Sequence, residues 1–389
     1  MDGRIYLDYA ATTPLSTDVY KEMLKCFQDV NGNSNSLHAF GREASEVLEK
    51  SRATVAKTIN AKANEIYFTS GGTEANNWAL FGIARANKDK GNHIIVSAFE
   101  HPSVIESAKR LEQEGFSVSF VPINKDGIVD YKEIVKLIKA ETILISVMTV
   151  NNELGTIQPI KAIAQLAKAY NILFHTDAVQ ALSSIKIDVQ DMGIDALSIS
   201  AHKIYGPKGI GALYVKNGTK IERLMYGGEQ ERNMRAGTTN IPSIMGFAKA
   251  CELMVADFDE KAKILARVKK YFITELTTKI QNVGINGNLS KSVSNIVSVD
   301  FKNIDGEAVL MLLDLAGVAV SIGSACSSGS TTGSHVIKAL DPKKVKSTVR
   351  FSFSYLTTME EIDYTIKELS KIVSNLRQLS PEKIKREAK

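Results

Sequence analysis

The chain has 389 residues, of which 44% are hydrophobic and 23% charged, and its formal net charge is +5. This composition is typical of a soluble globular protein with an ample core, and the length suggests two domains or one large domain with an appendage. Basic and acidic residues are mixed along the whole sequence, so no basic block indicates a nucleic-acid surface.

The sequence contains three cysteines, Cys26, Cys251 and Cys326. Because they are odd in number and far apart, they match neither a disulfide framework nor the paired spacing of a metal site. The first residues contain no charged-then-apolar leader, and no apolar run is long enough to span a membrane. We therefore expect a reduced, cytoplasmic protein with no resident metal, no membrane contact and no direct nucleic-acid contact.

Between residue 45 and about residue 215, helical segments alternate with short apolar runs that favour strands. This alternation predicts an α/β fold with a mostly parallel sheet that is covered by helices on both faces. Ligands bind such sheets at the carboxyl ends of the strands. The predicted strands are 65–70, 93–99, 117–123, 142–149, 172–178, 196–201 and 210–215.

The second half of the chain has a different character. Residues 243–282 are predominantly helical and could link two lobes, and a strand at 295–301, a helix at 306–315 and a strand at 348–354 follow. A last long helix begins near Thr358, where the sequence TMEE matches a capping box. We expect three units: an N-terminal segment 1–15 that packs with the small domain, a large domain 16–255, and a small α+β domain 256–389 that carries a cysteine loop at 321–334.

The loop after the first predicted strand reads Ser70-Gly71-Gly72-Thr73, and a helix follows it. Two glycines and a hydroxyl at a helix N-terminus can form a phosphate cradle, because free backbone N–H groups and the helix dipole favour an anion. The alternative is an N-capped strand-to-helix junction without a ligand. The loop matches neither a Walker loop nor GxGxxG, so it does not favour a nucleotide.

Asp177 and Lys203 each follow a predicted strand, so both would point into the same crevice. A pyridoxal phosphate site needs this pair, because the lysine holds the cofactor as a Schiff base and the carboxylate keeps the pyridine nitrogen protonated. A structural salt bridge, or two solvated loop ends, would also explain either residue alone. The phosphate loop about 100 residues earlier favours the cofactor.

Two more polar groups follow strands. His101, in FEHPSV, could stack on a cofactor ring or move protons, and the alternative is a capping or surface histidine. In the run Asn151-Asn152-Glu153 an amide could bond to a ring hydroxyl, and the alternative is a simple turn.

Arg350 lies in the predicted strand 348–354. By the two-residue period of a strand it shares one face with Ser352 and Ser354, while Val349 and Phe353 lie on the other. A guanidinium there could bind the carboxylate of an amino acid in a bidentate manner. The alternative is a solvated polar face.

Cys326 differs from the other two cysteines, which fall in helical patterns and are interpreted as packing residues. It lies among glycines and serines in SIGSACSSGSTTG, a composition that keeps a chain mobile. Taken alone, it could also be an accidental loop cysteine.

These motifs together resemble the pyridoxal-phosphate-dependent cysteine desulfurases of the NifS/IscS branch, within aminotransferase class V. The resemblance runs from YLDYAATTP to TTMEEIDYTI and includes SGGTEANN, VNNELG, HTDAVQ, SAHKIYGPKGIGALY, GGEQERNMRAGT, GSACSSGS and VRFS. It implies the fold-type I aminotransferase architecture with a seven-stranded sheet, a homodimer and pyridoxal phosphate as cofactor. One departure is Gly32-Asn33-Ser34-Asn35-Ser36, where relatives commonly carry a proline after the asparagine.

The resemblance also implies residue roles. Lys203 would bind the cofactor, Asp177 would pair with the ring nitrogen, His101 would stack and shuttle protons, and Cys326 would be the nucleophile. The remaining expected contacts are Gly72, Thr73, Ser200 and His202 with Thr238 of the partner subunit for the phosphate, Asn152 and Gln180 for the ring hydroxyl, and Arg350 with Asn33 and Asn152 for the substrate.

The implied reaction removes sulfur from L-cysteine, giving L-alanine and a persulfide on Cys326. An acceptor protein, such as an iron–sulfur scaffold or a tRNA-thiolation protein, would take the sulfur, and with a scaffold Cys326 could transiently bind a cluster. For this role we expect the loop to be poorly ordered, with Cys326 away from Lys203.

Other functions remain open at this point. A selenocysteine lyase or a transaminase would keep the cofactor, although a transaminase has no use for Cys326. A cysteine hydrolase could pair Cys326 with His101 or His335, but it leaves Lys203 and Asp177 unexplained. A non-catalytic scaffold would not need Lys203.

Overall fold

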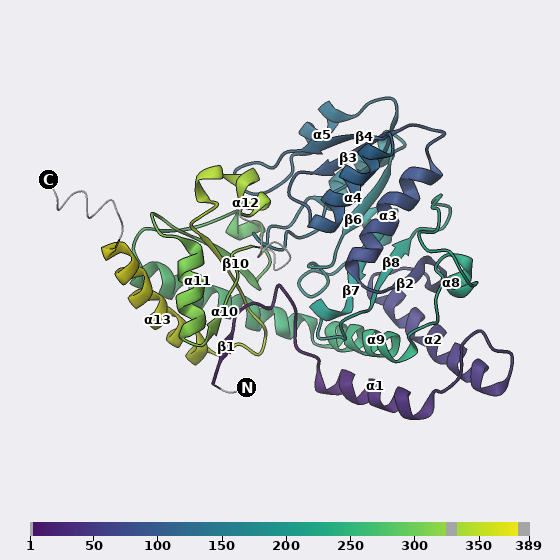
Figure 1. The fold of residues 1–389 in the computed structure, drawn as a ribbon, viewed down its shortest axis with the longest axis horizontal. Coiled ribbons are helices and arrows are strands. Elements are labelled where there is room, and N and C mark those ends of the chain that lie inside the picture. The colour runs from purple at the N-terminus through teal and green to yellow at the C-terminus, as the bar shows by residue number, and fades with distance from the viewer. Residues whose placement is uncertain (1–2, 324–332, 380–389) are drawn as a thin grey trace.

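A computed structural model describes residues 3–323 and 333–379. It has a large α/β part around a seven-stranded sheet and a smaller part around a three-stranded sheet, which lie side by side (Figure 1). The long helix α10 (Phe258–Lys279) belongs to the smaller part and follows α9 (Ile241–Ala256) of the larger part after a single residue, Asp257. The region predicted as predominantly helical is therefore two helices with a break.

The large sheet has the strand order β2-β8-β7-β6-β5-β3-β4. All pairs are parallel except those of β8, which runs antiparallel to both β7 and β2. Each strand lies inside a run predicted from the sequence, so the prediction of a mostly parallel sheet is confirmed. The strands are β2 (Ile66–Thr69), β3 (His93–Ser97), β4 (Ser117–Val121), β5 (Thr142–Ser146), β6 (Leu173–Asp177), β7 (Ala196–Ser200) and β8 (Gly211–Val215).

Helices cover both faces of this sheet, and alternate strand residues belong to different core clusters. Ile94 and Val96 pack with α3 and α4, whereas Ile95 between them packs in the cluster that contains α2, α6 and α9. The period of two therefore buries the strands on both sides. The helices of this part, besides α9, are α1 (Thr17–Asp29), α2 (Ala39–Thr58), α3 (Gly72–Ala86), α4 (Pro102–Gln113), α5 (Tyr131–Leu137), α6 (Ile160–Ala169), α7 (Val189–Met192) and α8 (Gln230–Asn233).

The smaller part has a sheet of order β12-β10-β9 that is antiparallel throughout, and it packs with α10, α11 and α13. The N-terminal strand β1 pairs with β11 of this part, and Leu7 belongs to its core cluster. We propose on this basis the division into segment 1–15, large domain 16–255 and small domain 256–389. The elements are β1 (Ile5–Tyr6), β9 (Val283–Ile285), β10 (Ile296–Phe301), α11 (Gly306–Leu315), β11 (Val318–Ala319), α12 (His335–Leu340), β12 (Thr348–Ser352) and α13 (Met359–Gln378).

The capping box predicted at Thr358 is confirmed. The Thr358 hydroxyl accepts from the N–H of Glu361 at 3.2 Å, and the Glu361 carboxylate accepts from the N–H of Thr358 at 2.9 Å. These two bonds satisfy donors that the first turn of α13 leaves free, so they fix where the helix begins.

None of the helices within residues 3–323 and 333–379 is both long and apolar enough to cross a membrane. That part of the chain also holds no group of three His, Cys, Asp or Glu side chains that could bind a metal ion.

A buried histidine in the large sheet predicts an acid-sensitive stability. His175 is fully buried between Ser146 and Ser198, with Nδ1 at 2.8 Å and Nε2 at 3.1 Å from their hydroxyls. Burial lowers its pKa from 6.5 to about 3, so the unfolded chain binds a proton that the folded chain does not. The contribution of neutral His175 to the free energy of unfolding is therefore fully present above pH 6.5, and it is lost as the pH falls towards 3.

We expect His175→Gln to flatten this dependence, because glutamine does not titrate. The measurement is the thermal midpoint of both proteins between pH 7.5 and 4. If the two curves fell in parallel, His175 would not be a source of the acid sensitivity.

Candidate active site

A cavity of about 170 Å³ lies at the carboxyl ends of the central strands of the large sheet. Both parts of the molecule contribute to it, because Arg350 comes from β12 and most other groups come from the large sheet and its loops. The lining residues are Ala10, Ala11, Gly72, Thr73, Asn76, His101, Ser103, Met148, Asn152, Asp177, Val179, Gln180, His202, Lys203 and Arg350.

The structure brings Asp177 and Lys203 to this cavity from neighbouring strands. Asp177 is the last residue of β6, and Lys203 ends the short 3₁₀ helix Ala201–Lys203 that follows β7. The amine of Lys203 donates to the carbonyl oxygens of Ala10 and, at 2.8 Å, of Ala11. The Asp177 carboxylate is fixed as an acceptor by the Val179 N–H at 2.9 Å and by Asn76 Nδ2 at 2.7 Å.

The loop at residues 70–73 has the backbone of an anion site. Helix α3 begins at Gly72, and the preceding Gly71 has a φ of +155°, which a residue with a side chain rarely adopts. Gly71 supplies no side-chain cap, so the first N–H groups of α3 are open to a ligand. A Cβ on Gly72 would lie 2.6 Å from Val179 Cγ2, so the close approach to the cavity wall needs glycine.

His101 caps helix α4 and lines the cavity. Its Nδ1 accepts from the Ser103 N–H at 3.2 Å, which places the proton of a neutral ring on Nε2. Burial lowers the pKa of the ring; the charge of Asp177 acts in the opposite direction, and the charge of Lys203 offsets part of that effect. At neutral pH the ring is therefore uncharged, with one N–H to offer.

Glu100, the residue before His101, is fully buried and did not stand out in the sequence. Burial raises its pKa to about 8, and the negative charge of Asp177 adds to this effect. The Ser97 hydroxyl and the Met148 N–H, at 2.6 Å, donate to its Oε1. Protonated at neutral pH, Glu100 supports the loop before His101 without adding a second negative charge beside Asp177.

Arg350 is buried, with 2% of its surface exposed, so its strand does not present the solvated polar face that was one alternative. Its Nη2 pairs with Asp8 at 2.6 Å and its Nη1 donates to the Asn152 carbonyl at 2.9 Å, but its Nε is buried without a partner. Gln180 Oε1 is also buried and unpaired. Because such groups are costly to leave unsatisfied, this donor and this acceptor fit a polar ligand in the cavity.

This geometry predicts the effect of Arg350→Lys. A lysine keeps the positive charge but cannot offer the planar fork, so one charge-assisted bond to a substrate carboxylate should be lost. Such a bond contributes about 1.5–3 kcal/mol, which corresponds to a KM for the expected substrate, L-cysteine, raised about 10- to 100-fold. Alanine formation measured over a range of cysteine concentrations checks this, and an unchanged KM would contradict it.

Three of the sequence-predicted residues that the structure describes do not line the cavity. Ser200 ends β7 and its hydroxyl donates to the Ile210 carbonyl at 3.4 Å. Thr238 is exposed, and Asn33 lies in the loop before α2, where its Oδ1 accepts from the Asn35 N–H. Cys326 and the loop around it lie outside the described residues. The role of Cys326 and the expected poor order of its loop therefore stay predictions.

Sequence reasoning gave no role to three polar contacts of the site. Asn76 holds the Asp177 carboxylate, Asp8 pairs with Arg350, and the carbonyls of Ala10 and Ala11 hold Lys203. The sequence position of Asn76 could have indicated its role, because Asn76 lies on the first turns of the helix that follows the phosphate loop. No sequence pattern indicates the N-terminal contacts, since they join residues about 190 to 340 positions apart.

Fold and site together define a class of enzyme: residues 5–365 match the family model described as aminotransferase class-V. A cysteine desulfurase IscS from Dictyoglomus turgidum is 46% identical over 98% of this chain and 98% of its own length. A solved NifS-like protein superimposes with a TM-score of 0.90 at 37% identity, over 96% of this chain and all of that one. Within the class, the chain belongs to the cysteine desulfurase family.

A further solved structure, SspA in complex with cysteine, is 33% identical to this chain with a TM-score of 0.81, over 91% of this chain and all of that one.

Proposed function

We propose that this cysteine desulfurase binds pyridoxal phosphate in the cavity, releases L-alanine from L-cysteine, and carries the sulfur as a persulfide on Cys326. The observation that carries the proposal is the convergence of Lys203, Asp177 and the open helix N-terminus at residues 71–73 in one cavity. The relative that was solved in complex with cysteine supports L-cysteine as the substrate of this protein.

The residues present fit the cofactor. The turn at residues 71–73 would hold its phosphate, the Asp177 carboxylate would bond to the protonated ring nitrogen, and Gln180 Oε1 would accept from the ring hydroxyl. Lys203 would attach the aldehyde covalently. When bound, pyridoxal phosphate supplies an electron-accepting ring that stabilises negative charge at the substrate Cα.

Residues of the chain itself would orient the substrate and move its protons. Arg350 orients the substrate through its carboxylate, and its unpaired Nε is the donor for that contact. The Lys203 amine would be the base that takes the Cα proton of the substrate. The neutral His101 ring would lie on the cofactor face and hold a proton at Nε2.

Sulfur transfer needs a thiolate. The Cys326 sulfur would attack the substrate sulfur, so that an S–S bond forms as the substrate C–S bond breaks. The electron pair stays with the carbon, which takes a proton to become the methyl group of alanine. The persulfide would then pass to a thiol of an acceptor protein, for which an iron–sulfur scaffold and a tRNA-thiolation protein are our candidates.

We also propose a homodimer in which Thr238 of one subunit contacts the phosphate in the other. Its exposure in the single chain, away from its own cavity, supports a role towards a second copy. Asn33 and Ser200 keep their proposed roles near the substrate and the phosphate.

The test of the function is a single-turnover incubation of the yellow holoenzyme with L-cysteine. One alanine per active site and one extra sulfur on the peptide that contains Cys326, found by mass spectrometry, are the expected results. Pyruvate in place of alanine, or no added sulfur, would overturn the proposal.

A further inference from the structure

The short segment at residues 230–235 has an unusual backbone. Glu231, Arg232 and Asn233 have φ angles of +49°, +58° and +61°, a left-handed conformation that residues with side chains rarely adopt in succession. Such a conformation persists only where the surrounding contacts determine it. The contacts of these residues therefore indicate what the segment is for.

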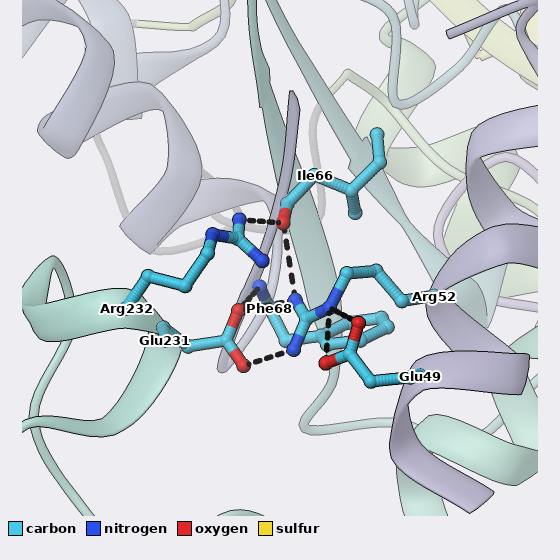
Figure 2. Close-up of polar contacts among 6 residues, drawn as sticks. All are labelled: Glu49, Arg52, Ile66, Phe68, Glu231 and Arg232. Carbon is cyan, nitrogen blue, oxygen red and sulfur yellow. Dashed lines mark hydrogen bonds and ion pairs between the residues drawn. The ribbon is translucent and has the colours of Figure 1, made fainter. Parts of the chain in front are cut away.

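The first set of contacts ties this segment to β2, the edge strand of the large sheet (Figure 2). The Glu231 carboxylate accepts two bonds from Arg52, at 2.6 and 2.9 Å, and one from the Phe68 N–H at 2.9 Å. The side chains of this ion pair are 2% and 4% exposed. Arg52 and Arg232 both donate to the Ile66 carbonyl, at 3.0 and 2.7 Å, so side chains occupy the backbone groups at this sheet edge.

The second set of contacts ties the segment to the first turn of α3. Arg235 forms a two-bond fork with the Glu74 carboxylate, at 2.8 and 3.0 Å, and Glu74 also accepts from the Ser70 N–H at 2.8 Å. Burial would raise the pKa of Glu74, but the bonds from Arg235 and Ser70 outweigh it and hold the pKa below its usual value. Glu74 is therefore a carboxylate at neutral pH.

The turn at residues 70–73, which follows β2 and opens α3, lies between these two sets of contacts. Within it Gly71 is free to adopt many conformations, so an unbraced turn would be costly to order around an anion. We propose that residues 230–235 position this turn for the phosphate of the cofactor, with Arg235 and Glu74 as the positioning residues. This inference rests on the proposed function.

The negative charge of Glu74 makes the role of Arg235 measurable. The Glu74 carboxylate bonds to the turn itself, where it would repel a bound phosphate if Arg235 did not neutralise it. Arg235→Gln removes the Arg235–Glu74 ion pair and leaves the Glu74 carboxylate without a positive partner. The double variant Glu74→Gln with Arg235→Gln also lacks the ion pair, but it has no carboxylate that could repel the phosphate.

The experiment compares pyridoxal phosphate with pyridoxal, which lacks the phosphate, by absorbance titration of the apoenzyme. For Arg235→Gln we expect the Kd of pyridoxal phosphate to rise about tenfold or more while that of pyridoxal stays within about twofold. The double variant should lose less affinity than Arg235→Gln, and Arg235→Lys should recover part of it. Arg85→Gln is the matched control, because Arg85 forms a similar fork with Glu114 at the other end of α3.

Equal losses for both ligands, or a double variant worse than Arg235→Gln, would mean that these contacts only stabilise the fold. An unchanged ratio of the two Kd values would also overturn the inference. Should Arg235→Gln fail to fold, Arg235→Lys and the double variant carry the same comparison. A wild-type apoenzyme that binds neither ligand would instead contradict the proposed function.

Discussion

Lys203→Ala should lower alanine formation from cysteine by more than about a thousandfold, the largest loss expected from any residue of the cavity. Lys203 is the residue that would attach the cofactor and would also take the proton from the substrate Cα. Its amine is held towards the cavity by the carbonyls of Ala10 and Ala11. No other lysine lines this cavity in the described part of the chain.

Two measurements separate the loss of attachment from misfolding. The variant should not become covalently linked to the cofactor after borohydride reduction, whereas the wild-type chain should gain its mass. Lys208→Ala is the matched control, because Lys208 is exposed in the same loop and does not line the cavity. Activity of Lys203→Ala close to that of wild type would refute the role of this lysine.

The large sheet could be predicted because its strands are buried on both faces. Runs such as 142–149 and 196–201 consist of apolar residues with a few small hydroxyl residues and no charged ones, and such runs suit a strand between two layers of helices. The strand order and the antiparallel direction of β8 could not be predicted, since pairing depends on tertiary contacts that periodicity does not encode. The start of α13 could be predicted from its capping box, because the residues that form it are neighbours in the sequence.

The site could be predicted where it depends on strand ends. Asp177 and Lys203 meet because β6 and β7 are parallel neighbours whose carboxyl ends share one edge of the sheet. Contacts made by irregular segments could not be predicted. Asp8 reaches Arg350 from the segment between β1 and α1, and Arg52 of α2 pairs with Glu231, which lies 179 residues further along the chain.

Cys326→Ala should lower sulfur transfer to an acceptor thiol by at least about a thousandfold, while cofactor binding stays unchanged. The other two cysteines cannot replace it. Cys26 and Cys251 are both fully buried, and burial raises the pKa of each thiol, to about 12 for Cys251, so neither forms the thiolate that attacks sulfur.

The described residues on either side of the Cys326 segment bond to Arg350, which lines the cavity, and to Glu153, which follows the cavity residue Asn152. Ser321 exchanges two backbone bonds with Arg350, at 2.6 and 3.1 Å, and the Ser334 hydroxyl donates to Glu153 at 2.5 Å. Cys326 comes five residues after Ser321, and five fully extended residues span at most about 17 Å, so the chain length limits how far the thiol can lie from Ser321. Transfer of radioactive sulfur from cysteine to a reduced acceptor measures the effect, with Cys26→Ala as the control that keeps activity. Sulfur found on Cys26 or Cys251 of wild-type protein would assign the carrier role elsewhere.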